Sequence, residues 1–211
     1  MGADHDHAVT FDGMNDDYKR RLMLVTAINI GMFVVEMAAG QLSGSQALKA
    51  DALDFFADGV TYALSFWAIG KPVAVRSGAA LLKGMSLLAM GLWVAGSTLY
   101  QFFVLGVPQA EVMGVVGLMA MGANLLSVFL LVAYKDGDAN VRSVWLCSRN
   151  DAIGNVAVVI AALFVALLGT GVPDLIVAGV MAVLFLSSAY QILIQAYGEW
   201  REAADHSGHG H

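Results

Sequence analysis

Six stretches of mainly apolar residues alternate with short polar connectors along most of the chain. A helix needs about 20 mainly apolar residues to cross the hydrocarbon core of a bilayer. We therefore predict an all-α integral membrane protein with six transmembrane helices, at 22–40, 47–70, 79–104, 111–134, 142–169 and 174–197. The connectors carry Gly, Pro, Asp and Ser residues typical of turns, and none has room for an extramembrane domain.

Basic residues predict the orientation of these helices, because cytoplasmic loops carry an excess of Lys and Arg. Basic residues precede the first helix, lie in the second and fourth connectors and follow the last helix; they are Lys19, Arg20, Arg21, Lys71, Arg76, Lys135, Arg142 and Arg201. The first, third and fifth connectors contain no Lys or Arg. Both termini are therefore expected in the cytoplasm. Residues 1–21 are predicted to be a disordered cytoplasmic tail and 198–211 a short cytoplasmic tail that contains histidines. Lys49 and Lys83 lie near predicted helix starts, from which they can reach an interface.

Composition agrees with a membrane protein and excludes several other classes. Hydrophobic residues make up 58% of the chain and charged residues 13%, whereas a soluble domain has about 25% charged residues. The net charge of −6 comes largely from an acidic N-terminal tail, and no basic stripe indicates nucleic-acid binding. The single cysteine cannot form an internal disulfide. We find no hydrolase or ATP-binding motif, so we do not expect an enzyme or a prosthetic group.

Two pairs of polar residues, each four positions apart, interrupt the apolar helices. Asp54 and Asp58 lie in the second helix, and Cys147 and Asp151 lie in the fifth. Residues four apart lie on one face of a helix, and ionisable groups at membrane depth are costly, so they are functional candidates. Two carboxylates one turn apart can share a divalent cation and repel each other without one. Asp51 shares the same helical stripe. The alternative is that these acids only cap a helix or line a polar bundle interior.

The remaining polar groups leave alternatives open. Cys147 is either a soft metal ligand or a small packing residue. Glu36 is a proton relay, a partner of Arg149 or a polar contact between helices. Asp174 stands at a helix start, where the helix dipole favours an acid. All five histidines lie in the tails, as a weak metal-collecting segment or as solvated residues (His5, His7, His206, His209 and His211).

These motifs, in this order, resemble the transmembrane domain of the cation diffusion facilitator family. The family pattern in the first two helices matches Asn29, Phe33, Glu36, Gly40, Ser43–Ser45, Ala47–Leu48 and Ala50–Ala52. The family's metal-site signatures, each ending in Asp four residues after His or Asp, fall on Asp54 and Asp58 and on Cys147 and Asp151. The resemblance covers residues 18–197. Cys147 stands where the family has His, and the family's C-terminal soluble domain has no counterpart in the sequence.

The resemblance implies export of a divalent transition metal in exchange for protons, by alternating access and as a homodimer. It implies that 22–197 is a cation-transport domain, with metal ligands Asp54, Asp58, Cys147 and Asp151. Asp51 and Glu36 are possible additional ligands or proton carriers. We expect a bacterial inner-membrane protein whose cargo is zinc, with cobalt, cadmium, nickel, manganese and ferrous iron left open. Alternatives are a family-derived partner or sensor that binds metal without transporting it, and a channel without proton coupling.

Overall fold

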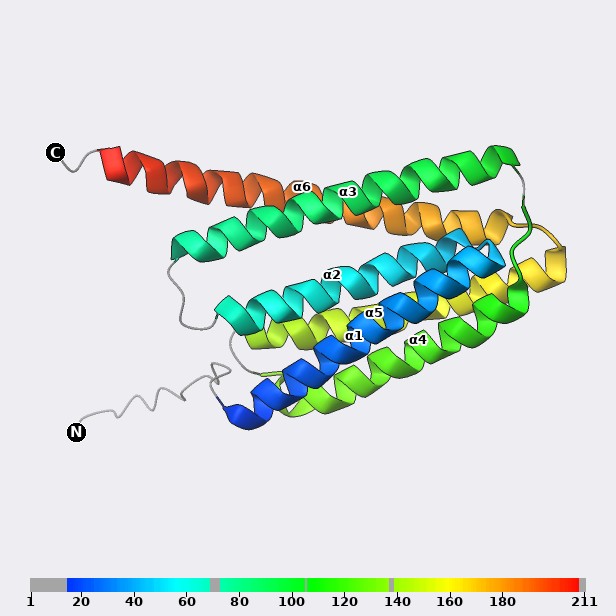
Figure 1. Ribbon diagram of the computed structural model, residues 1–211, viewed down its shortest axis with the longest axis horizontal. Helices are drawn as coiled ribbons and strands as arrows, with labels where there is room; N and C mark the ends of the chain where they lie inside the picture. The colour runs from blue at the N-terminus through cyan, green and yellow to red at the C-terminus, as the bar shows by residue number, and fades with distance from the viewer. Residues whose placement is uncertain (1–14, 69–72, 105, 137–138, 209–211) are drawn as a thin grey trace, which may run out of the picture.

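The computed structural model describes residues 15–68, 73–104, 106–136 and 139–208, and within them it contains six α-helices (Figure 1). Their bounds are α1 Asp16–Ser43, α2 Gln46–Ala68, α3 Val73–Val104, α4 Ala110–Leu131, α5 Ala139–Leu168 and α6 Val172–Gly208, with a 3-10 turn, η1, at Val132–Tyr134. The predicted order of six helices is confirmed. Their orientation across the membrane stays a prediction.

The ends of α1 and α6 lie beyond the predicted boundaries. α1 begins at Asp16, so 16–21 are helical rather than part of a disordered tail. Asn15 caps this helix by accepting a hydrogen bond from the Asp17 N–H at 2.8 Å, and acids in the first turn favour the same start. α6 continues to Gly208, well past the predicted end at residue 197. His5, His7, His209 and His211 lie outside the described residues.

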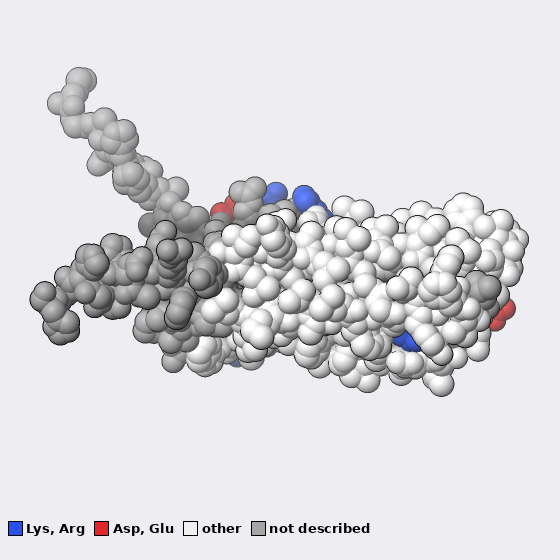
Figure 2. All heavy atoms as spheres, turned by 90° about the horizontal axis from the view of Figure 1, so that it is seen from above, with Lys and Arg blue, Asp and Glu red and all other residues white. Residues whose placement is uncertain are grey.

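Five of the helices are long and apolar enough to cross a membrane, and they confirm a multi-pass membrane protein. α2 misses the same criterion because it carries Lys49, Asp51, Asp54 and Asp58. Large apolar side chains are exposed along the other helices, and the face in Figure 2 consists mainly of residues without charge. Such a surface suits lipid rather than water.

The helices form two groups (Figure 1). α3 and α6 pack along each other, while α1, α2, α4 and α5 pack together beside them. Glycines bring α3 and α6 close, since a Cβ atom at Gly84 or Gly91 would lie 2.9 Å from Leu193 or Leu186 respectively. Small residues at such contacts let helix backbones approach within the bilayer. The α3–α6 pair therefore forms one packed unit beside the other four helices.

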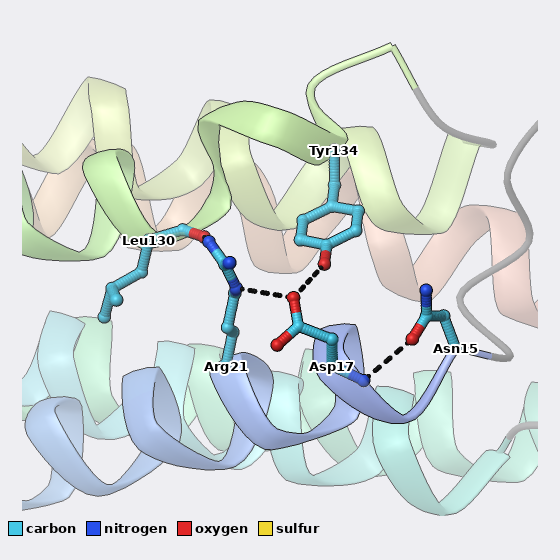
Figure 3. A network of polar contacts seen from close by, with 5 residues as sticks. All are labelled: Asn15, Asp17, Arg21, Leu130 and Tyr134. Atoms are coloured by element: carbon cyan, nitrogen blue, oxygen red, sulfur yellow. Dashed lines mark hydrogen bonds and ion pairs between the residues drawn. The ribbon is translucent and has the colours of Figure 1, made fainter.

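A polar cluster joins the start of α1 to the end of α4 (Figure 3). The Arg21 guanidinium donates to the Asp17 carboxylate and to the Leu130 carbonyl, both at 3.0 Å. The Tyr134 hydroxyl donates to the same Asp17 carboxylate at 2.7 Å. Because the cluster is exposed, it orients these helix ends more than it stabilises them.

Asp174 joins the start of α6 to the start of α2. Its carboxylate, 1% exposed, accepts hydrogen bonds from the Ser45 hydroxyl at 2.6 Å, the Gln46 N–H at 2.8 Å and the Ala47 N–H at 3.0 Å. The Ser45 hydroxyl oxygen accepts the Leu48 N–H at 3.0 Å. Asp174 thus caps α2 as well as standing in the first turn of its own helix. This contact sets where the acid-bearing helix begins.

Candidate metal centre

A cavity of about 530 Å³ lies among α2, α3, α5 and α6. Asp54 and Asp58 of α2 and Cys147 and Asp151 of α5 all line it. All four side chains are half-buried. The fold therefore brings the two predicted pairs, which are about 90 residues apart in sequence, to one space. We call these four residues the candidate ligands.

The two pairs face each other closely enough to interact. The Asp151 carboxyl group interacts with the carboxyl groups of both Asp54 and Asp58. The Cys147 thiol interacts electrostatically with the same two carboxyl groups. Three carboxylates this near one another cannot all be ionised without a compensating cation or proton. The arrangement can therefore hold a divalent cation or bound protons.

The candidate ligands are not preassembled around one point. Among the described residues, no three Asp, Glu, His or Cys side chains are already spaced to hold one metal ion. Binding would require side-chain rotations that draw oxygen and sulfur ligands to about 2.0–2.3 Å from a zinc ion.

Tyr62 supports Asp58 and is a residue that the sequence analysis missed. Its hydroxyl donates a hydrogen bond to the Asp58 carboxylate and lies 3.4 Å from the Ser148 hydroxyl of α5. The Tyr62 side chain is 0% exposed, so this geometry is held by packing. The signal was present in the sequence, because Tyr62 continues the spacing of Asp51, Asp54 and Asp58 along one helical stripe.

Asp51 lies on the same cavity but is held by a different set of partners. Its carboxylate accepts a hydrogen bond from the Asn155 amide at 2.6 Å, and Asn155 accepts one from Asn124 at 2.9 Å. All three side chains are buried. These hydrogen bonds connect α4 through α5 to α2. Asn124 had not been identified from the sequence.

Glu36 lies beside Asp51 in the interior of the helix group. It is 0% exposed, and among the described residues the group that reaches its carboxyl oxygens is the Asp51 carboxyl. The two carboxyl groups interact with each other. Arg149 is not its partner, because Arg149 is exposed and stacks on the Trp145 ring at 5.3 Å. The Glu36 and Asp51 carboxyl groups therefore form a buried pair beside the cavity.

Lys83 also lines this cavity, and the sequence analysis did not connect it with the candidate ligands. α3 begins at Val73, and its apolar span begins at Leu81, close to the predicted start at 79, so Lys83 lies near the beginning of that span. Its half-buried side chain faces the space that the candidate ligands share. The site therefore contains a basic group that the sequence analysis had not assigned to it.

Comparisons with known proteins agree with this architecture. A model of the cation efflux transmembrane domain matches residues 22–199. The chain is 27% identical to the zinc transporter ZitB of Escherichia coli over 95% of the chain and 68% of the relative. It is 24% identical to a cadmium, cobalt and zinc/H(+)-K(+) antiporter of Bacillus subtilis over 84% of the chain and 62% of that relative. It is 25% identical to the metal cation efflux system protein CzcD of Cupriavidus metallidurans over 80% of the chain and 56% of that relative.

Proposed function

The chain belongs to the cation efflux transmembrane domain family, and on this premise we propose that it exports a divalent transition-metal cation in exchange for protons. The names of the relatives, which include zinc, cadmium and cobalt, support this class of cargo. The name of the Bacillus subtilis relative also includes protons. The chain covers 68%, 62% and 56% of these relatives, so the activity of the whole relatives is carried over only as a proposal.

The observation that carries the proposal is the cavity shared by the α2 and α5 pairs. We assign Asp54, Asp58 and Asp151 as oxygen ligands and Cys147 as the sulfur ligand of the cargo ion. Four ligands of this kind can complete a tetrahedral zinc site. Thiolate favours soft metals and carboxylate favours hard ones, so the same set also suits cadmium and cobalt.

Exchange with protons follows from the chemistry of these ligands. Carboxyl and thiol groups bind metal only after they lose their protons, so metal affinity should rise with pH. Asp51 and Glu36 are suited to carry protons, since both are buried and adjacent while Asp51 also reaches the cavity. Protons that leave these carboxyl groups as metal enters would balance its charge.

Alternating access would use the two groups of helices. The cavity lies between the α3–α6 pair and α2 and α5, so movement of the pair would change which side of the membrane the cavity faces. We further propose a homodimer in a bacterial inner membrane, with both termini cytoplasmic and residues 22–197 as the transporting unit.

The test is zinc flux into proteoliposomes under an imposed pH gradient. We expect flux that depends on the gradient and is abolished by Asp54→Ala and by Asp58→Ala. Asp16→Ala is the matched control, because Asp16 is an exposed acid outside the cavity. Flux that survives both cavity substitutions would refute the ligand assignment. Metal binding without flux would identify a non-transporting protein, and flux independent of pH would identify a channel.

A further inference from the structure

Lys83 is the basic residue among those that line the cavity in the described part of the chain. It lies on α3, whereas the candidate ligands lie on α2 and α5. Its ammonium interacts electrostatically with the Asp54 and Asp58 carboxyls and with Cys147. It forms no ion pair within 4.0 Å with a described carboxylate. Lys83 therefore acts on the candidate ligands across the cavity rather than as a bound partner of one of them.

A fixed positive charge in this position affects every cation that enters. Its ammonium repels the cargo, which weakens binding. It also favours loss of protons from the carboxyl ligands, so its direct effect on the cargo is seen once these ligands are ionised. Surrounding apolar residues limit screening by water and salt, which keeps the interaction effective over several ångströms. The energy of this interaction is proportional to the charge of the entering cation.

We propose that Lys83 is a specificity-determining residue of the cargo site, where its ammonium makes the binding free energy of a cation less favourable in proportion to the cation's charge. Lys83 belongs to the α3–α6 pair, while the carboxylates belong to the other group of helices. Approach of α3 would therefore bring the ammonium nearer the cargo and promote its release. This inference rests on the proposed function, because it concerns the same site.

The experiment compares cations of different charge on the purified full chain in detergent. Zn²⁺ and Tb³⁺ affinities are measured by calorimetry at several pH values and extrapolated to fully ionised ligands, which removes competition from protons. The unchanged chain is compared with Lys83→Met, which keeps the length and removes the charge. We expect Zn²⁺ to bind about tenfold more tightly to the variant. Tb³⁺ should then gain about thirtyfold, because the logarithm of the change scales with the cation's charge, three against two. A change in packing alone would not produce that ratio.

Two variants serve as controls. Lys83→Arg keeps the charge and should leave both affinities within about threefold. Lys49→Met removes a lysine charge that does not line the cavity, and it should change neither affinity. Lys83→Gln is measured in parallel, so that a folding defect specific to methionine does not decide the result.

Several outcomes would overturn the role of Lys83. These are unchanged or weaker Zn²⁺ binding in both charge-removing variants, equal factors for Zn²⁺ and Tb³⁺, or a gain in Lys83→Arg as large as that in Lys83→Met. Asp54→Asn separates this failure from failure of the site. If Asp54→Asn does not weaken Zn²⁺ binding in the unchanged background, the ligand assignment itself is wrong.

Discussion

Replacing Asp174 by Ala tests whether this residue secures the start of α2. The substitution removes the acceptor of three hydrogen bonds and leaves the Ser45 hydroxyl and the Gln46 and Ala47 N–H groups without their partner. Two of these donors belong to the first turn of α2, whose dipole also favours the negative charge. At about 1 kcal/mol for each bond after partial replacement by water, we expect a loss of about 3 kcal/mol in the free energy of unfolding.

Asp174→Asn provides a graded comparison. One carboxylate oxygen accepts from Ser45 and Ala47, and the other accepts from Gln46. An amide can keep the first two bonds, but its NH₂ group then faces the Gln46 N–H, so donor meets donor. We expect Asn to cost less than Ala, about 1–2 kcal/mol, because it loses the charge and one bond.

The assay is reversible unfolding in mixed micelles, followed by circular dichroism for both variants and for Ser45→Ala. Ser45→Ala removes one bond to Asp174 and the cap on the Leu48 N–H, so the double variant should lose less than the sum of the two single losses. A loss below about 0.5 kcal/mol in Asp174→Ala, within the range of ordinary surface changes, would refute the capping role. Strictly additive losses would show that Ser45 and Asp174 do not act together.

Two further predictions concern the candidate ligands. Tyr62→Phe keeps the buried ring but removes the hydroxyl that orients Asp58, so zinc affinity in calorimetry should fall about tenfold, as it does when groups that orient metal ligands are lost; an unchanged dissociation constant would show that Asp58 needs no such support. Cys147→Ser replaces sulfur by oxygen and should weaken Cd²⁺ binding more than Mn²⁺ binding, because thiolate favours the softer ion. Equal losses for both ions, or none, would mean that Cys147 only packs.

Features that arise within one helix were predictable from the sequence. Apolar length predicts each crossing, since the bilayer sets the number of residues required. Spacing of three or four residues places Asp51, Asp54 and Asp58 on one stripe, and it does the same for Cys147 and Asp151. α2 was predicted as well, although its charged residues keep it out of the set of helices that are apolar enough to span a membrane.

Features that arise between helices were not predictable in the same way. Asp174 caps a helix that begins 128 residues earlier, and Asn124 supports Asn155 across two helices. In a membrane protein, apolar residues face both lipid and other helices, so the hydrophobic pattern does not reveal which helices are neighbours. The same ambiguity left Arg149 as a possible partner of Glu36.

The position of Lys83 in the cavity could not be predicted from its own helix. From the sequence, Lys83 was a lysine near the start of the predicted span 79–104, with nothing to connect it with the acids of another helix. Its relation to Asp54, Asp58 and Cys147 depends on how the α3–α6 pair packs against α2 and α5. The sequence by itself determined six crossings and two polar pairs, because both follow from the geometry of single helices. Only the tertiary structure decided that the pairs share one cavity with a lysine, because packing between helices sets which stripes meet.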